Sequence, residues 1–202
     1  MTKIILVRHG HVEGISPERF RGRADLMLTA EGHRQAEATA RLIQAAWTPA
    51  ALYTSPLSRC RATGEAIGRP FGLPPDPLSG LIDIDYGEWQ GLTPDEARKQ
   101  SPEQLETWYQ APDWAMIPGG ETLQDVHART AAALREVTGK HPKDTVVMVG
   151  HDSVNRVILL HALQLPLARY WRLGQHPCAI NELDFSEAGF TVQSLNETQH
   201  LK

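Results

Sequence analysis

The sequence has few of the features that mark a secreted or membrane protein. Its 202 residues include two cysteines, Cys60 and Cys178, whose positions fit neither a metal-binding spacing nor a disulfide framework. No apolar run approaches the length that crosses a bilayer, and the chain enters a predicted strand directly, without a signal-like apolar segment. We therefore expect a cytoplasmic protein with no membrane partner.

A large excess of charge of one sign is also missing. The chain has 20 Lys and Arg residues and 24 Asp and Glu residues, which gives a formal net charge of −4. Nothing in this balance indicates broad electrostatic binding to nucleic acid, so an anionic ligand would need a local arginine cluster. Internal repeats are absent, and a hydrophobic content of 41% can bury one sizeable core. These observations predict a single domain over residues 1–202.

Two stretches of the chain place a histidine directly after an apolar run. The first reads K-I-I-L-V-R-H-G over residues 3–10, and the second reads T-V-V-M-V-G-H-D over residues 145–152. Such runs are typical of strands buried in a parallel sheet, which carries its chemistry beyond the carboxyl ends of the strands. A lone histidine is more often structural, but parallel neighbouring strands would bring His9 and His151 face to face. The pair therefore favours a functional site.

Helical and strand patterns alternate along the rest of the chain. The predicted helices cover 30–46 with Thr29 as N-cap, 58–67, 94–109 in one or two pieces, 121–138, and 153–163 with Asp152 or Ser153 as cap. A further strand is expected at 51–55, and the Pro- and Gly-rich stretch 68–80 is expected to be loop. Strands 179–185 and 190–195 are expected to form an antiparallel hairpin at the sheet edge. The alternation predicts an α/β fold with three layers, α/β/α, around a mostly parallel central sheet. A cap of helices and loops is expected as an insertion around 92–120.

The predicted strand ends gather side chains that suit a phosphoryl group. The cations and imidazoles are Arg8, His9, Arg59 and His151. A carboxylate would come from Asp83, Asp85 or Glu88. Two planar guanidinium groups match phosphate oxygens, one histidine could attack phosphorus, and a protonated carboxyl could serve the leaving group. This chemistry needs no metal and no cofactor.

The start of the predicted helix at 58–67 gives a second indication of an anion. Arg59 and Arg61 occupy its first turn, where the helix macrodipole favours negative charge. A bound anion would remove that conflict. Cys60 lies between the two arginines, and a small structural residue is the favoured interpretation over a reactive thiol.

Five segments of the sequence resemble the histidine phosphatase superfamily, in its phosphoglycerate mutase-like branch, which includes α-ribazole phosphatase and broad-specificity phosphatases. Leu6 to Gly10 reads L-V-R-H-G, and Phe20 to Gly32 is similar to the family's F-Q-G-R-x-D-x-P-L-T-x-x-G segment. Ser55 to Arg59 reads S-P-L-S-R, Pro118 to Thr122 reads P-G-G-E-T, and Asp83 falls on the acid of L-x-E-x-x-Y-G. The order of these segments along the chain is the family's order.

The resemblance implies a role for each matched residue. His9 would be the nucleophile and Asp83 the general acid, with Glu88 as the alternative acid. Arg8, Arg59 and His151 would bind the phosphoryl group. The substrate-binding set implied by the resemblance adds Arg21, Gly22 and Ile15.

The sequence also departs from the family's pattern. Val12 and Ile15 stand where R-H-G-x-T-x-x-N has Thr and Asn, and Arg21 replaces a common Gln. Asp83 replaces the usual glutamate, and H-D-S-V-N-R over 151–156 replaces the commoner H-G-G-x-x-R. These departures indicate altered substrate selection, in which Arg21 reaches a second anionic group.

The sequence favours a metal-independent phosphomonoester hydrolase acting through a phosphohistidine on a small anionic phosphorylated metabolite. A phosphoglycerate mutase would use the same intermediate, but the compact chain favours the phosphatase. A metal-dependent hydrolase would use His9, His11, His151 and Asp152. The third alternative is a non-catalytic module that binds a phosphorylated ligand. The family's tendency makes a homodimer conceivable, although no sequence feature shows one.

Overall fold

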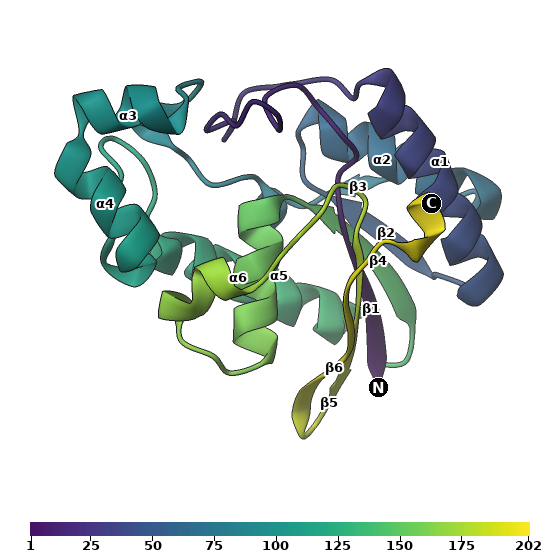
Figure 1. The fold of residues 1–202 in the computed structure, drawn as a ribbon. Helices are drawn as coiled ribbons and strands as arrows, with labels where there is room; N and C mark the ends of the chain where they lie inside the picture. Colours follow the sequence, from purple (N-terminus) through teal and green to yellow (C-terminus); the bar gives the residue numbers. More distant parts are fainter.

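A central sheet of six strands organises the molecule (Figure 1). The computed structural model describes all residues from 1 to 202. The strands are β1 Thr2–Arg8, β2 Ala51–Thr54, β3 Asp76–Pro77, β4 Thr145–Gly150, β5 Ile180–Ser186 and β6 Gly189–Glu197, and their order across the sheet is β3-β2-β4-β1-β5-β6. β1 pairs in parallel with β4, β4 with β2 and β2 with β3, whereas β5 and β6 are antiparallel. The mostly parallel sheet and its antiparallel edge hairpin are as predicted.

Helices cover both faces of this sheet. α1 Ala30–Ala46 and α2 Ser58–Gly68 lie on one face, and α5 Leu123–Lys140 and α6 Asp152–Ala162 lie on the other. The alternation of side chains along β1 explains the two layers, since Ile5 and Val7 pack toward α1 and α2 while Ile4 and Leu6 pack toward α5 and α6. The predicted three-layer α/β/α architecture is therefore confirmed.

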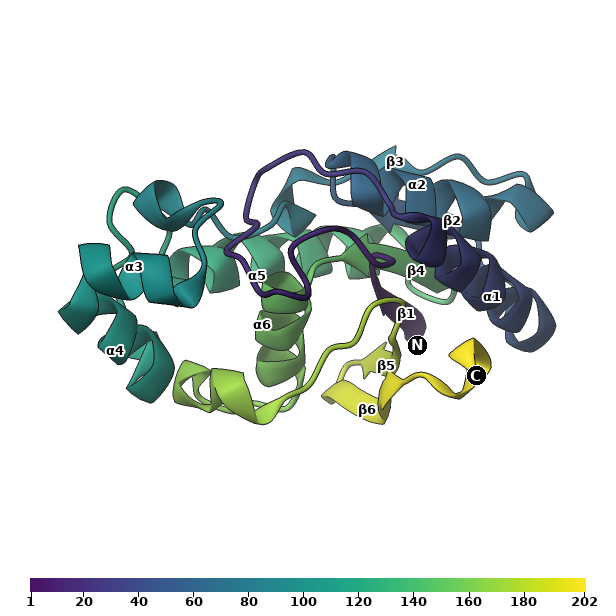
Figure 2. The ribbon, with the colours of Figure 1, turned by 45° about the horizontal axis from the view of Figure 1, so that its top comes forward.

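Two further helices stand to one side of the layers. α3 Pro94–Gln100 and α4 Pro102–Gln110 lie beyond α5 and α6, far from α1 and α2 (Figure 2). The buried Trp108 of α4 joins them to the rest of the molecule, because its carbonyl accepts a hydrogen bond from the Trp171 indole at 2.7 Å. Pro102 divides the helical stretch in two, since proline has no N–H to continue the first helix. None of the helices is long and apolar enough to span a lipid bilayer.

The structure corrects three local predictions. His151 is the N-cap residue of α6, which begins at Asp152, so neither Asp152 nor Ser153 caps it. α5 begins at Leu123 because Thr122 and Asp125 form a capping box. The stretch 68–80, predicted to be loop, contains the exposed strand β3, whose two residues are too short to give a periodic signal.

Candidate active site

The register of β1 and β4 brings the two histidines together. Arg8 pairs with Gly150 at the ends of the strands, and the His9 N–H continues the ladder to the Gly150 carbonyl at 3.0 Å. The rings of His9 and His151 follow with their centroids 5.2 Å apart and an angle of 63° between their planes. The predicted juxtaposition of the two histidines at the strand ends is therefore present in the structure, with the rings edge-on to one another.

His9 is held as a neutral ring with one nitrogen occupied. Its Nδ1 lies 2.7 Å from the Gly10 carbonyl, which can only accept, so the proton is on Nδ1 and Nε2 carries the lone pair. Burial, followed by the neighbouring His151 and Arg59, lowers the pKa of His9 well below 6.5. A buried neutral imidazole with a free Nε2 is the form that a nucleophile requires.

His151 lies between a hydroxyl and a guanidinium group. Its Nε2 is 2.7 Å from Ser55 Oγ, and its Nδ1 accepts a hydrogen bond from Arg59 Nε at 3.2 Å. Burial and the charges of Arg59 and Arg8 lower its pKa well below 6.5. Because Nδ1 accepts from Arg59, the proton of the neutral ring is on Nε2, and the Ser55 hydroxyl accepts it.

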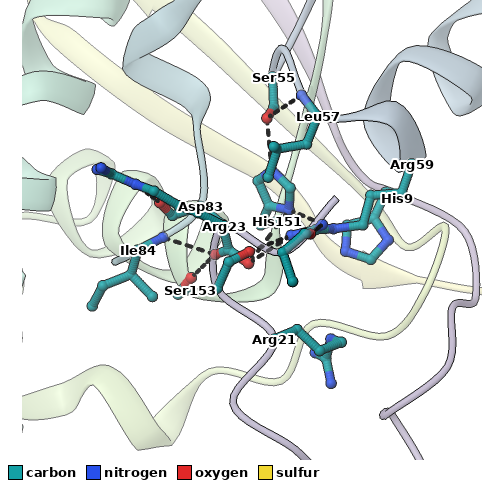
Figure 3. A network of polar contacts seen from close by, with 12 residues as sticks. His9, Arg21, Arg23, Ser55, Leu57, Arg59, Asp83, Ile84, His151 and Ser153 are labelled. Atoms are coloured by element: carbon teal, nitrogen blue, oxygen red, sulfur yellow. Dashed lines mark hydrogen bonds and ion pairs between the residues drawn. The ribbon is translucent and has the colours of Figure 1, made fainter. Parts of the chain in front are cut away.

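Arg59 links the loop, the histidine and the carboxylate of the site (Figure 3). Its guanidinium group is fully buried and donates to the carbonyls of Gly22 and Ala24, both at 2.7 Å. Nη2 also lies 3.1 Å from Asp83 Oδ2. The planar guanidinium group of Arg59 therefore joins the loop after β1, the segment of Asp83 and His151.

Arg8 brings a second buried guanidinium group to the strand ends. Its Nη1 donates to the Gln175 carbonyl, and its Nε is buried with no protein partner. Burial lowers the pKa of Arg8, because the charged form is desolvated. An unpartnered cationic N–H beside two histidines is suited to bind an anion.

Asp83 is the carboxylate that reaches the site. Oδ2 lies 3.1 Å from Arg59 Nη2 and 3.5 Å from His151 Nδ1. Oδ1 accepts the Ile84 N–H at 3.0 Å and the hydroxyl of Ser153. The side chain is 6% exposed and is ringed by donors.

Asp85 and Glu88 take other positions. Asp85 accepts the Gly87 N–H at 2.9 Å and pairs with Arg23, so it holds the turn that follows. Glu88 is exposed on the far side of that turn, and its carboxylate forms no hydrogen bond or ion pair. Of the three carboxylates considered from the sequence, only Asp83 contacts Arg59 and His151.

The loop between β1 and α1 places the other expected substrate-binding residues. Arg21 Nη1 donates to the Gly14 carbonyl at 2.6 Å, and Arg21 lines a cavity together with Asp83, Ser153 and aromatic side chains. Figure 3 shows Arg21 beside the network, without a contact to it. Gly22 offers its carbonyl to Arg59, and Ile15 packs against an apolar cluster that contains Val12.

The loop also changes the interpretation of the α2 N-terminus. The Asp25 carboxylate accepts both the Ser58 N–H and the Ser58 hydroxyl at 2.8 Å, which lowers the pKa of Asp25. The anion predicted at the N-terminus of α2 is therefore the carboxylate of Asp25. Between them, Asp25 and Arg59 hold the loop at the mouth of the site.

Two residues of the metal-hydrolase alternative, His11 and Asp152, do not join His9 and His151. His11 Nδ1 lies 2.9 Å from Thr29 Oγ1, and the Asp152 carboxylate pairs with Arg156 at 2.8 Å. No three His, Cys, Asp or Glu side chains are placed together to hold a metal ion. Cys60 is buried 3.4 Å from His151, and burial raises the pKa of its thiol far above the usual range, so the structural interpretation of this cysteine holds.

Sequence reasoning missed several residues that support the site. Ser55 and Ser153 contact His151 and Asp83 through single hydroxyls. Arg129 donates to the Asp83 carbonyl at 3.3 Å and pairs with Glu121 of the P-G-G-E-T segment. The P-G-G-E-T segment could be recognised from the resemblance. Only the fold shows that its Glu121, through Arg129, holds the backbone of Asp83.

Comparison with known proteins places this geometry in a family. The histidine phosphatase superfamily (branch 1) matches residues 4–198. Phosphoserine phosphatase 1 of Hydrogenobacter thermophilus is 30% identical, over 100% of this chain and 95% of that protein. Among solved structures, Bacillus stearothermophilus YhfR gives a TM-score of 0.95 at 26% identity, with complete coverage of both chains.

A third similar protein was solved with a ligand. The H9A mutant of the phosphoserine phosphatase from Entamoeba histolytica, in complex with phosphoserine, gives a TM-score of 0.89 at 25% identity and covers 100% of each chain. The two histidines, two arginines and carboxylate described above lie within the matched region. This chain belongs to the histidine phosphatase superfamily, branch 1, and is a phosphatase of that type.

Proposed function

We propose that the protein hydrolyses a small anionic phosphomonoester through a phosphohistidine on His9, without a metal ion. The observation that carries the proposal is the neutral His9 ring, whose Nδ1 is bound to the Gly10 carbonyl at 2.7 Å while Arg8, Arg59 and His151 surround it. A neutral imidazole beside two guanidinium groups can attack phosphorus without repelling the phosphate.

In the first step His9 Nε2 forms a bond to phosphorus as the bond to the leaving oxygen breaks. Arg8 and Arg59 would stabilise the equatorial oxygens, because their planar donors match that geometry. His151 would donate to a phosphoryl oxygen from Nδ1 once Arg59 Nε has turned from that nitrogen to the phosphoryl group, with the Ser55 hydroxyl then donating to Nε2. Asp83 Oδ2 would give its proton to the leaving oxygen.

In the second step water attacks the phosphohistidine. Asp83 Oδ2 takes the proton of that water, and the His9–phosphorus bond breaks to release inorganic phosphate. The two guanidinium charges of Arg8 and Arg59 match the two charges of a phosphate dianion. The charge balance of the site therefore supports a phosphomonoester as substrate.

The substrate class follows from the cavity beside Asp83. Arg21 lines it with Tyr86, Tyr170 and Trp171, so a carboxylate on the leaving group would meet the Arg21 guanidinium in a cavity with aromatic walls. Phosphoserine is the first candidate, since two of the similar proteins carry that substrate in their names. Ile15 and Gly22 would contribute to this side of the site through the loop that carries Arg21.

The cap is proposed to cover the same cavity. Residues 92–120 contain α3 and α4, and Trp108 of α4 packs against Tyr170 and Trp171 with ring centroids 5.3 and 5.5 Å apart. Movement of this segment would change the shape of the cavity wall. A single domain with this cap, a cytoplasmic location and a homodimer stay predictions from the sequence.

Phosphate release in the presence of excess chelator tests the proposal. The assay compares phosphoserine, 3-phosphoglycerate, glycerol 3-phosphate and p-nitrophenyl phosphate with wild type and His9→Ala. We expect wild type to release phosphate and His9→Ala to lose at least about 10³-fold in kcat, because the nucleophile is removed.

Three other outcomes would contradict it. Movement of phosphate between hydroxyl groups of phosphoglycerate, without release, would make the protein a mutase. Binding of these compounds without turnover would make it a binding module. Turnover that disappears with chelator and returns with a divalent metal ion would make it a metal-dependent hydrolase.

A further inference from the structure

Ser153 is a buried hydroxyl that the mechanism above does not use. It lies in the first turn of α6, two residues after His151, and is 3% exposed. Its Oγ donates to Asp83 Oδ1, across 70 residues of sequence. Serine at a helix start usually caps the helix, but the N-cap of α6 is His151, and the Ser153 hydroxyl points away to the carboxylate (Figure 3).

The contacts divide the two oxygens of Asp83 into different roles. Oδ1 accepts from Ser153 and from the Ile84 N–H at 3.0 Å, and the backbone N–H can only donate. Oδ2 accepts a single hydrogen bond, from Arg59 Nη2 at 3.1 Å, and lies 3.5 Å from His151 Nδ1. Oδ1 is therefore the anchored oxygen, and Oδ2 is the oxygen that can carry a proton toward a bound phosphoryl group.

We infer that Ser153 is a positioning residue for the general acid: its hydroxyl fixes the Asp83 carboxyl so that Oδ2 presents the proton to the leaving oxygen. This inference rests on the proposed phosphatase mechanism. When the bond between phosphorus and the leaving oxygen breaks, the proton moves from Oδ2 to that oxygen and the carboxylate stays held by Ser153, Ile84 and Arg59. Hydrolysis of the phosphohistidine returns a proton from water to Oδ2.

Two departures of the sequence meet in this contact. Asp83 stands where the resemblance has glutamate, and Ser153 stands where it has glycine. An aspartate carboxyl is one methylene closer to its backbone than a glutamate carboxyl, and a hydroxyl on α6 reaches it there. Because α6 also follows His151, the same helix start sets the distance between the acid and the phosphate-binding histidine.

The dependence of kcat/KM on the leaving group tests this role. An alkyl phosphate such as phosphoserine needs a proton on its leaving oxygen, whereas 2,4-dinitrophenyl phosphate releases a stable anion and needs none. kcat/KM reports steps up to the first irreversible one, so dephosphorylation of His9 does not mask the effect. We expect Ser153→Ala and Ser153→Gly to lose about 10- to 100-fold on phosphoserine and less than about 3-fold on the dinitrophenyl ester.

Rescue and control variants separate positioning from folding. Ser153→Thr keeps a hydroxyl at a residue that lines a cavity, so it should retain phosphoserine turnover within about 3-fold of wild type. Thr138→Ala removes another buried hydroxyl, which bonds only within α5, and should affect neither substrate. In an Asp83→Asn background, removal of Ser153 should cost nothing further, because the acid that it positions is gone.

Equal losses on both esters, or a loss that persists in the Asp83→Asn background, would overturn the role of Ser153 and leave the phosphatase mechanism intact. Unchanged turnover of phosphoserine by Ser153→Ala would overturn it as well. Failure of wild type to turn over either ester would instead overturn the proposed function, and the inference with it.

Discussion

At the scale of single residues, the site depends on burial as much as on charge. His9 and His151 are buried beside two guanidinium groups, and desolvation is the largest cause of the lowered pKa of each ring. Both rings are therefore neutral at pH 7, although imidazoles in water titrate near that value. A neutral pair leaves one free nitrogen on His9 for attack and keeps the positive charge on Arg8 and Arg59.

Arg59→Lys tests whether the planar fork matters beyond its charge. A lysine would keep one positive charge, but its donors sit on a single nitrogen and cannot replace the three nitrogens with which Arg59 reaches His151, the loop carbonyls and Asp83. We expect kcat/KM for a phosphomonoester to fall about 10²- to 10³-fold. Arg61→Lys, on the exposed side of the same helix, should leave the rate unchanged. A wild-type rate in Arg59→Lys would mean that charge alone is sufficient.

The sequence predicted the ionic residues of the site better than the neutral ones. His9, His151, Arg8 and Arg59 follow recognisable strands or open a helix, so pattern alone brings them together. The residue pattern alone did not separate Asp83 from Glu88, and the resemblance only ranked Asp83 first, because the two share one segment and the turn at Gly87, with φ of +46°, sends Glu88 outward. Hydroxyls such as Ser55 and Ser153 have partners far away in sequence, and no local pattern identifies those partners.

At the scale of elements, the loop after β1 is set by its contact with α1. A Cβ on Gly10 would lie 2.5 Å from the Gly32 carbonyl, and a Cβ on Gly32 would lie 2.2 Å from the His11 carbonyl. Both distances are shorter than any carbon–oxygen contact, so the two glycines allow the backbone of α1 to approach the residues that flank His9. The close approach fixes the Gly10 carbonyl on which His9 Nδ1 depends.

Gly32→Ala is expected to move this loop. Alanine is the better helix former by about 1 kcal/mol, but here its methyl group must displace the His11 carbonyl. We predict a net loss of about 1–3 kcal/mol in the free energy of unfolding, measured by urea denaturation, and a fall in activity.

Gly139→Ala is the matched control for this prediction. Gly139 lies in α5 with nothing within 4 Å of its Cβ position, so alanine should stabilise the protein by about 0.5–1 kcal/mol. A stabilised and fully active Gly32→Ala variant would show that the contact between the loop and α1 does not constrain the site.

Element prediction succeeded where a local signal was strong. Thr29 caps α1 and the helix covers Ala30–Ala46, as its alanine-rich amphipathic pattern indicated. The tryptophans show the limit of such reasoning, since Trp108 is 1% exposed in the core but Trp114 is 78% exposed. Both lie in the cap, and only the packing of α4 against Trp171 distinguishes them.

At the scale of the whole molecule, the buried histidines link stability to pH. The pKa of His9 and that of His151 are lowered well below 6.5 in the folded protein, whereas the unfolded chain takes up protons near 6.5. Between these values the unfolded state binds more protons, so the free energy of unfolding rises with pH. It should level off above about pH 7, where neither state binds protons at these rings.

The expected slope is about 1.4 kcal/mol per pH unit for each ring below pH 6. Urea denaturation at pH 5, 6, 7 and 8 measures it for wild type and His9→Gln. The variant should show a slope lower by up to that amount between pH 5 and 6. His33→Gln, which removes an exposed histidine, should follow wild type. Identical slopes for wild type and His9→Gln would show that His9 takes up its proton in the folded protein.

Detection of the covalent intermediate tests whether His9 is the nucleophile. Wild type is mixed with phosphoserine, quenched in alkali after milliseconds, digested, and analysed by mass spectrometry for a phosphoryl group on the peptide that contains His9. Phosphohistidine survives alkali and is lost in acid, which separates it from phosphoserine. His11→Ala, next to the site but bonded to Thr29, serves as the control. We predict an acid-labile phosphoryl group on His9 in wild type and in His11→Ala, and none in His9→Ala. Turnover of phosphoserine by wild type with no phosphoryl group on His9, together with an active His9→Ala variant, would contradict a phosphohistidine mechanism on His9.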